Sequence, residues 1–349
     1  MNESVKKAAE IIKNYDGRPL RIMEVCGTHT HEIFRLGIRN MLSDKINLIS
    51  GPGCPVCVTP VGFVDEAIAL ALEYRCTICT FGDLVRVPGS EQSLADARAK
   101  GADVEMMYSP VDALEYARAN PDKDVVFLSV GFETTTPASC IAVRDAKVEG
   151  IRNFSILTAN KTMDNAYRAL KGSADAFLYP GHVSTVSGTG IYQELAAEGI
   201  SGVVAGFTGP EILTALAVSV LKTEKGEPFF VNCYPRVVTD EGSAQARRLI
   251  EELMEPVDSE WRGLGVIPLS GLKLREEYAD YDARTKHNLR HIEGRPNKAC
   301  RCGEVLQGKC LPQDCPVFGK GCTPEHPIGA CMVSNEGACS AFYKYDMHQ

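Results

Sequence analysis

The chain has 349 residues, of which 44% are hydrophobic and 23% are charged, and its formal net charge is −8. This composition is typical of a globular protein with two or three domains, and an acidic chain without clustered basic residues is not expected to bind nucleic acid. No apolar run approaches the ~20 residues of a membrane helix, and the charged N-terminal helix lacks the apolar core of a signal peptide, so we expect a cytoplasmic protein without membrane contact.

From residue 20 to about 240, short apolar runs alternate with helical patterns. The runs expected to form strands are 20–25, 45–50, 76–81, 104–108, 124–130, 153–159, 176–179, 202–207 and 228–233. Short apolar strands with helices between them are typical of βαβ units, whose parallel sheets are covered on both faces. The pattern predicts an α/β fold in which two parallel-sheet domains, residues 1–135 and 136–255, flank a cleft.

The regular alternation ends near residue 255, and the chain becomes rich in Cys, Gly and Pro from residue 295 onward. Seven of the 14 cysteines lie between Cys300 and Cys339. Thiols are kept reduced in the cytosol, so metal binding or redox chemistry is a better explanation for them than disulfides. A segment that cannot bury a core alone needs such crosslinks, and we predict a small Cys-rich iron–sulfur domain over residues 256–349.

Five of the predicted strands end in loops with an unusual composition. Each combines glycine or proline with Cys, His, Asp, Arg or Glu: CGTHTH (26–31), GPGCPVC (51–57), GDLVRVPGS (82–90), GFETTTP (131–137) and PGHVS (180–184). Ligands of parallel α/β sheets bind outside the carboxyl ends of the strands. We therefore expect these loops to line one cleft that carries metal-binding or redox groups.

Cys26 and His29 are three positions apart, so a helix that begins at Gly27 or Thr28 would place them on one side. A helix N-terminus lowers the pKa of a thiol, and a thiolate with an imidazole suits iron, copper or zinc. The alternative is that Cys26 is a small buried side chain, with Thr28 as a helix cap. His31 is expected to have a structural role.

Cys54 and Cys57 form a C-x-x-C, the spacing of thiol–disulfide oxidoreductases and of half a zinc site. Cys76 and Cys79 do not complete that zinc site, because their spacing in a strand points them to opposite faces, and we expect both in the core. This leaves Cys54 and Cys57 as a redox pair or as metal ligands together with Cys26.

Glu133 is the strongest candidate on the remaining loops, because this acid directly follows a fully apolar strand. Asp83, Arg86 and His182 also lie at strand ends, where each could equally be a surface or capping residue.

Four tail cysteines are spaced by 7, 9 and 8 residues: Cys315, Cys322, Cys331 and Cys339. Four thiolates can hold a [4Fe–4S] cluster or a zinc ion. Zinc ribbons prefer paired C-x-x-C knuckles, which the tail lacks, so the spacing favours the cluster. Any of three further cysteines could replace one of the four: Cys300, Cys302 and Cys310.

The loops CGTHTH, GPGCPVC, TFGDLVRVPGS, GFETTTP and PGHVS, followed by CPVFGKGCTPEHPIGACMVSNEGAC, closely resemble the hydrogenase maturation factor family HypD. The resemblance spans nearly the whole chain. It implies two α/β domains and a cluster domain, and a role in assembling the iron centre of [NiFe] hydrogenases, which carries two cyanides and one carbon monoxide.

The resemblance also implies partners and residue roles. A HypC-type chaperone would form the scaffold with this chain, and a HypE-type protein would supply cyanide from an S-bound thiocyanate. Cys26 would ligate the iron, with His29 beside it, and Cys54 and Cys57 would relay electrons from a [4Fe–4S] cluster held by the tail cysteines.

Two other functions fit the same residues. The chain could be a stand-alone iron–sulfur disulfide reductase that uses Cys54 and Cys57, or a binding module whose tail holds structural zinc.

Overall fold

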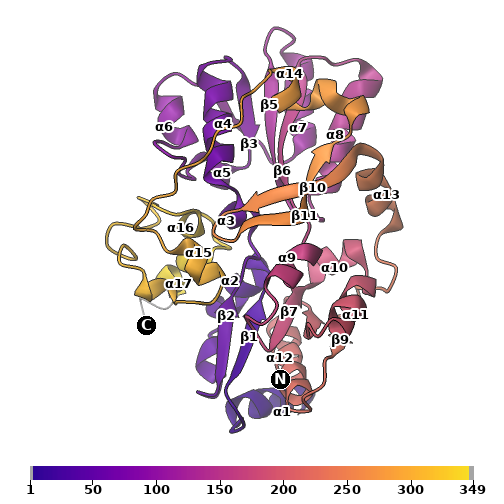
Figure 1. The fold of residues 1–349 in the computed structure, drawn as a ribbon, viewed down its shortest axis with the longest axis vertical. Helices are drawn as coiled ribbons and strands as arrows, with labels where there is room; N and C mark the ends of the chain where they lie inside the picture. Colours follow the sequence, from indigo (N-terminus) through magenta and orange to yellow (C-terminus); the bar gives the residue numbers. More distant parts are fainter. Residues whose placement is uncertain (1–2, 346–349) are drawn as a thin grey trace.

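The computed structural model describes residues 3–345, which contain two parallel β-sheets, one above the other in Figure 1. All nine runs expected to be strands form strands, so the predicted α/β fold is confirmed. The strands are short and mostly buried, as expected when helices cover both faces of a parallel sheet.

The lower sheet, called sheet A here, has the strand order β2-β1-β7-β8-β9. Its strands are β1 (Leu20–Glu24), β2 (Ile46–Ser50), β7 (Ala176–Pro180), β8 (Gly202–Ala205) and β9 (Phe230–Asn232). The upper sheet, sheet B, has the order β4-β3-β5-β6. Its strands are β3 (Thr77–Thr80), β4 (Val104–Met106), β5 (Val125–Gly131) and β6 (Phe154–Asn160).

Helices connect and cover the strands. They are α1 (Glu3–Lys13), α2 (Gly27–Arg35), α3 (Pro55–Val58), α4 (Val61–Leu72), α5 (Gly82–Val85), α6 (Leu94–Ala99), α7 (Pro110–Ala119), α8 (Thr136–Glu149), α9 (Asp164–Ala169), α10 (Gly181–Ser187), α11 (Gly190–Ala197), α12 (Gly209–Thr223) and α13 (Ala244–Leu253). The helices α1 and α12 pack together on sheet A, while α4 covers one face of sheet B and α7 with α8 the other. Within residues 3–345, no helix is both long and apolar enough to cross a membrane.

Local sequence sets several helix ends. Thr208 and Glu211 form a reciprocal capping box at the start of α12, with Pro210 in its first turn. Helix α8 ends at Gly150, whose φ of 70° is in the left-handed region that glycine adopts without a Cβ clash.

The chain visits sheet A twice, which corrects the expected domain boundary at residues 135/136. That boundary separates β5 from β6, yet these two strands pair along their whole length within sheet B. The chain builds β1 and β2, then all of sheet B, and returns to sheet A at β7, which pairs with β1. The domain that holds sheet A is therefore built from two separate stretches of the chain, and the domain that holds sheet B is inserted between them.

The segment after residue 253 also differs from the expected single Cys-rich domain. Its first part is an antiparallel hairpin, β10 (Met254–Trp261) and β11 (Gly265–Leu274), that crosses between the two sheets (Figure 1). The hairpin, the 3-10 helix η2 (Glu276–Tyr281) and α14 (Ala283–Lys286) pack on sheet B, where Leu272, Leu274 and Tyr281 join its core.

The Cys-rich part begins only near residue 299 and lies beside α2 and α3 (Figure 1). Its helices are α15 (Cys302–Leu306), α16 (Ala330–Val333) and α17 (Ala338–Tyr345), and two further 3-10 helices of the chain are η1 (Ile38–Met41) and η3 (Pro312–Asp314). Helix α17 packs on α2 and α16 on α3, so the tail contacts the loops that follow β1 and β2.

Candidate functional site

The loops that follow β1 and β2 lie directly against each other. Cys26 caps the N-terminus of α2, and the N–H of Gly27 donates to the carbonyl of Gly53 at 3.1 Å. A Cβ on Gly53 would lie 2.1 Å from the backbone N of Cys26, so this approach requires glycine. The neighbouring strands β1 and β2 thus bring the CGTHTH and GPGCPVC loops together.

Cys26 is 8% exposed, and burial raises the pKa of its thiol to about 12. The Glu336 carboxylate raises this pKa further, while hydrogen bonds from the backbone of His29 and Thr28 lower it by less. The expectation that the helix N-terminus lowers this pKa is therefore wrong, because desolvation outweighs the helix end. A bound metal ion removes the proton from a coordinating thiol and would supply the missing positive charge.

His29 is fully buried, and burial lowers its pKa to about 4, so the ring is neutral at physiological pH. Its Nε2–H donates to the carbonyl of Gly206 at 2.9 Å, which leaves Nδ1 with a lone pair. Within residues 3–345 this Nδ1 is buried without a hydrogen-bond partner. Metal-binding histidines commonly donate their second nitrogen to a carbonyl, so His29 has the arrangement of a ligand.

Phe207, which the sequence did not single out, fixes both histidines of this region. Its ring stacks on His29 at 4.7 Å and on His182 at 3.9 Å between ring centroids. His182 therefore lies at the same edge of sheet A as His29.

Glu336 is a second residue that sequence reasoning missed. Its Oε1 accepts a hydrogen bond from Thr28 Oγ1 at 2.8 Å, and a Cβ on Gly27 would meet its side chain. The same tail segment contacts the next turn of α2, where His31 Nδ1 lies 3.3 Å from the carbonyl of Asn335. Thr28 and Glu336 are 308 residues apart in the chain, and no local pattern links them.

Cys54 and Cys57 lie at the two ends of the first turn of α3. Cys54 caps this helix, with Pro55 in the first position, and its Sγ accepts from the N–H of Cys57 at 3.3 Å. The Cys57 thiol is fully buried, and the neighbouring thiols of Cys331 and Cys54 raise its pKa. The pKa of Cys331 is lowered to about 6, first by the Cys302 thiol and then by Cys57. The C-x-x-C pair is thus joined directly to the Cys-rich tail.

The sulfur contacts continue beyond Cys331. The Cys302 thiol is the main neighbour that lowers the pKa of Cys331 and raises that of Cys339, and its Sγ lies 3.1 Å from the Sγ of Cys300. A series of neighbouring thiols, called the thiol chain here, therefore runs from the C-x-x-C pair into the tail. Its members are Cys54, Cys57, Cys331, Cys302, Cys300 and Cys339.

A small cavity in the tail is lined by five cysteines and by apolar side chains. The cysteines are Cys300, Cys302, Cys315, Cys322 and Cys339. Three of the four cysteines favoured by spacing lie here, whereas the fourth, Cys331, is adjacent through Cys302. Cys300 and Cys302 touch each other, so they cannot both bind separate irons of one cluster without moving apart.

Arg262, in the turn between β10 and β11, is a cation beside these thiols. Its backbone N–H donates to the carbonyl of Val58 at 2.8 Å, and its Nε donates to the carbonyl of Thr59 at 2.7 Å. Burial lowers its pKa, and the nearby Cys302 and Cys331 act in the opposite direction. The guanidinium is positioned to offset negative charge on thiolates at this junction.

A large cavity of about 1060 Å³ reaches the end of the thiol chain. Both Cys300 and Cys302 line it, together with several basic side chains: Arg86, Arg262, Arg295, Lys298 and Arg301. Arg86 also donates to the carbonyl of Pro324 at 2.8 Å, which ties the loop after β3 to the tail. Five acidic side chains line the same cavity, and two of them, Glu91 and Glu304, pair with Arg295 and Arg301. The cavity therefore connects the thiol chain to solvent through an opening of mixed charge.

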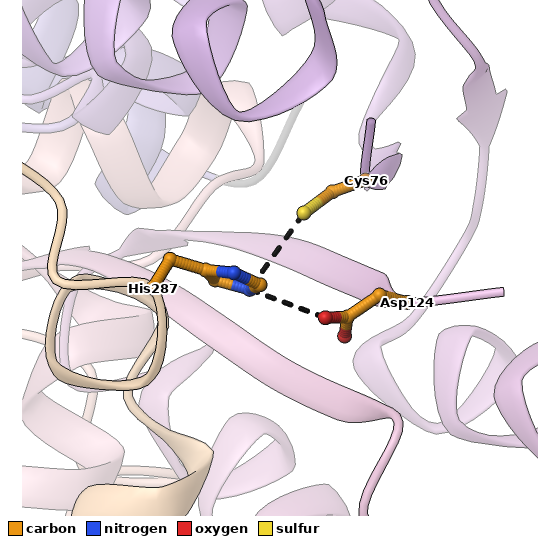
Figure 2. A group of neighbouring side chains, drawn as sticks. All are labelled: Cys76, Asp124 and His287. Atoms are coloured by element: carbon orange, nitrogen blue, oxygen red, sulfur yellow. Dashed lines mark hydrogen bonds and ion pairs between the residues drawn. The ribbon is translucent and has the colours of Figure 1, made fainter. Parts of the chain in front are cut away.

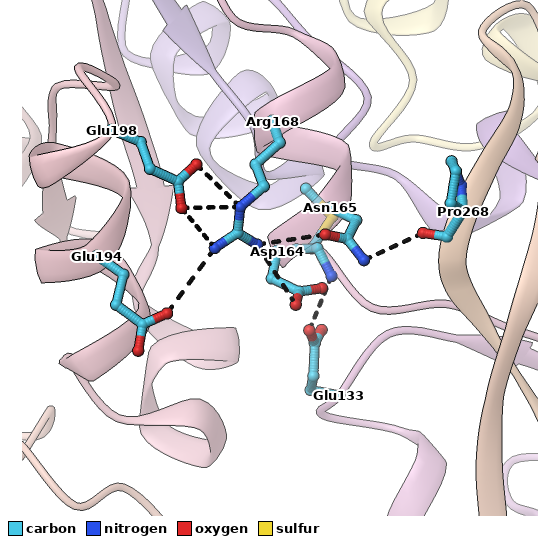
Figure 3. A network of polar contacts seen from close by, with 8 residues as sticks. Glu133, Asp164, Asn165, Arg168, Glu194, Glu198 and Pro268 are labelled. Atoms are coloured by element: carbon cyan, nitrogen blue, oxygen red, sulfur yellow. Dashed lines mark hydrogen bonds and ion pairs between the residues drawn. The ribbon is translucent and has the colours of Figure 1, made fainter.

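Glu133 lies away from the thiols, in the network of Figure 3. Its Oε1 accepts from the N–H of Met163 at 2.8 Å, while its Oε2 is buried without a partner within the described residues. Burial raises the pKa of Glu133 to about 7, and the neighbouring carboxylate of Asp164 contributes. No hydrogen bond or ion pair between residues 3 and 345 joins Glu133 to Cys26 or Cys57.

We expect Glu133→Gln to alter the pH dependence of stability. The folded pKa of about 7 exceeds the ordinary pKa of 4.5 for a glutamate, so the wild-type chain loses stability as pH rises from about 4.5 to about 7. The isosteric amide does not titrate, and the wild type should lose up to about 3 kcal/mol relative to the variant across this window. Urea unfolding of both proteins at pH 5 and pH 8 measures the difference, and equal pH dependence would contradict the assignment.

Comparison with known proteins identifies relatives along almost the full chain. The HypD family model, described as "Hydrogenase formation hypA family", matches residues 2–346. The hydrogenase maturation factor HypD of Azotobacter vinelandii is 44% identical over 340 residues, which cover 94% of this chain and 90% of the relative. The HypD of Escherichia coli (strain K12) is 43% identical over 354 residues, covering 98% of this chain and 94% of that protein. The hydrogenase expression/formation protein HupD of Azotobacter chroococcum mcd 1 is 43% identical over 351 residues, with coverages of 97% and 93%.

Proposed function

Because the chain belongs to the HypD family of hydrogenase maturation factors, we propose that it is the scaffold on which the Fe(CN)2CO unit of [NiFe] hydrogenases is assembled. A HypC-type chaperone would share the iron, and a HypE-type partner would deliver cyanide as a thiocyanate. The thiol chain is the observation that carries this proposal, since it joins a C-x-x-C beside Cys26 to a Cys-rich tail. We expect the iron unit to be assembled in the cytoplasm, where thiols stay reduced.

Cys26 is the proposed ligand for the iron under assembly. Its thiol is held, buried, at the start of α2, and the loop that carries Cys54 packs on this helix end through the hydrogen bond between Gly27 and Gly53. His29 lies on the same turn of α2, and its Nδ1 lone pair, buried without a partner within the described residues, is proposed to bind or orient the same iron. The iron here is cargo, which the scaffold must later release.

The tail cysteines fit a resident [4Fe–4S] cluster by their donor set. Soft thiolates in an apolar surrounding are the ligands of such clusters, and Arg262 lies where it offsets their negative charge. The proposed ligands remain Cys315, Cys322, Cys331 and Cys339. When bound, such a cluster passes one electron at a time.

Electron counting gives the C-x-x-C pair its role. Cleavage of a thiocyanate, R–S–C≡N, to a thiolate and cyanide breaks the S–C bond and consumes two electrons. Oxidation of Cys54 and Cys57 from the dithiol to the disulfide releases two electrons and two protons. The pair contacts the tail through Cys331 on one side and follows the loop that packs on Cys26 on the other. It therefore lies where an electron pair can be stored between the cluster and the iron.

Anaerobic purification tests the proposal directly. We expect the isolated complex to be brown, to hold about four cluster irons per chain and to show infrared bands of iron-bound cyanide and carbon monoxide. Metal analysis and infrared spectroscopy of the same sample measure both. Zinc in place of the cluster iron, with no such bands, would support the zinc-holding binding module instead.

A second candidate function is a stand-alone iron–sulfur disulfide reductase that uses Cys54 and Cys57. The large cavity favours it, because this cavity opens onto Cys300 and Cys302 at the far end of the thiol chain, where a disulfide substrate would have access. Co-purification with a small chaperone, dependent on Cys26, distinguishes the scaffold from such a reductase, which needs no partner.

A further inference from the structure

A cluster of three potential metal ligands lies in sheet B, on segments that the proposed function does not use. Cys76 directly precedes β3, Asp124 directly precedes β5, and His287 directly follows α14 (Figure 2). Neighbouring parallel strands place the first two side by side, whereas His287 arrives from the segment that leads to the tail. The ligand atoms of the three side chains all lie within 4.8 Å of one another.

The two distances from His287 match the edges of a zinc coordination polyhedron. The Nε2 of His287 is 3.6 Å from the Sγ of Cys76 and 3.5 Å from Oδ2 of Asp124. Four-coordinate zinc with bonds of about 2.0–2.3 Å places neighbouring ligand atoms about 3.3–3.6 Å apart. One sulfur, one nitrogen and one carboxylate oxygen are all normal zinc ligands.

The same geometry argues against a nucleophilic triad. In such a triad the imidazole bridges the thiol and the carboxylate through its two different nitrogens. Here Cys76 and Asp124 both converge on Nε2 of His287, as ligands around a shared ion do. Cys76 is also fully buried, and burial raises the pKa of its thiol to about 12, which makes a free thiol unreactive.

The surroundings hold these ligands in place and leave one side open. Lys286 donates to Oδ1 of Asp124 at 2.6 Å and to the carbonyl of Arg152 at 2.9 Å, which leaves Oδ2 free to face His287. The ring edge of Tyr74 packs on the imidazole with centroids 5.8 Å apart. The carboxylate is 36% exposed, so water can complete the coordination.

We propose that Cys76, Asp124 and His287 form a zinc site, separate from the thiol chain and from the iron under assembly. Its structural effect is to clamp the start of strands β3 and β5 to the end of α14. From there the chain runs along the molecule to the Cys-rich tail (Figure 1), so the clamp fixes the point at which that segment leaves sheet B. Bound zinc would thus stabilise the position of the Cys-rich tail relative to sheet B.

Zinc titration of the anaerobically purified full chain tests this site. With cluster iron measured in the same sample, we expect the wild type to bind one further zinc ion against a competing chromophoric chelator. Cys76→Ser, Asp124→Asn and His287→Gln should each weaken that binding by at least 10-fold. Cys140→Ser is the matched control, because Cys140 is a fully buried thiol on the other face of sheet B and should leave binding unchanged.

X-ray absorption at the zinc edge separates this site from zinc captured by the tail. The proposal requires a shell with one sulfur at about 2.3 Å and nitrogen or oxygen ligands at about 2.0–2.2 Å. A shell of several sulfurs, or zinc binding that survives His287→Gln, would overturn it. Neither result would bear on the iron-assembly proposal, whose readouts are the cluster irons and the cyanide and carbon monoxide bands.

Discussion

Replacement of Cys26 by alanine is expected to abolish the infrared bands of iron-bound cyanide and carbon monoxide on the complex. The thiol of Cys26 lies at the N-terminus of α2, and alanine keeps the backbone contact between Gly27 and Gly53 that holds this helix end. Loss of a direct ligand should exceed the 10–100-fold cost typical of losing a residue that only supports a ligand. Infrared spectroscopy of the anaerobically isolated complex, normalised to protein, measures the loss.

The cluster iron provides an internal reference for this variant. Because the proposed cluster ligands lie in the tail, Cys26→Ala should retain about four irons per chain while losing the assembled iron and the small partner. Cys233→Ala is the matched control, since Cys233 is a free, half-buried thiol that follows β9 in sheet A. If Cys26→Ala retained both the bands and the partner, the iron site would have to be placed elsewhere.

The strands of this fold follow from local sequence, but their assignment to sheets does not. Each apolar run is short and bounded by loop residues, so periodicity and composition suffice to find it. The pairing of β1 with β7 joins residues more than 150 positions apart, and nothing local marks that return. The hairpin β10–β11 is not predicted, because β11 does not alternate regularly between apolar and polar residues. Its exposed positions include the apolar Val266 and Leu269, and its burial depends on the neighbouring sheets.

The site residues also fall into a group that local sequence can predict and a group that depends on the tertiary fold. The contact between the Cys26 and Cys54 loops follows from consecutive strands that pair in one sheet, so the sequence could predict it. Glu336, Arg262 and His287 reach their sites from the C-terminal third of the chain, and only the tertiary fold brings them there.

The lowered pKa expected for the Cys26 thiol is wrong for another reason. The helix end can be read from the sequence, but the depth of burial that outweighs it cannot.

Replacement of Cys57 by serine is expected to lower the cyanide bands of the complex by about 10-fold or more. Serine is nearly isosteric and keeps the N–H that donates to Cys54, yet it cannot form the disulfide that stores two electrons. The variant also breaks the thiol chain at its contact with Cys331. Cys54→Ser should lose the bands equally, because either sulfur alone is insufficient for a two-electron step.

The decisive comparison is between the cyanide bands and the count of cluster irons in the serine variants. In Cys57→Ser and Cys54→Ser the cluster irons should stay at the wild-type count, because neither residue is a proposed cluster ligand, and Cys140→Ser should change neither quantity. Mass spectrometry after thiol alkylation should show a Cys54–Cys57 disulfide only in wild-type protein that has turned over. Full cyanide bands in either serine variant would show that electrons reach the thiocyanate one at a time by another route, and the thiol chain would then be a packing feature of the tail.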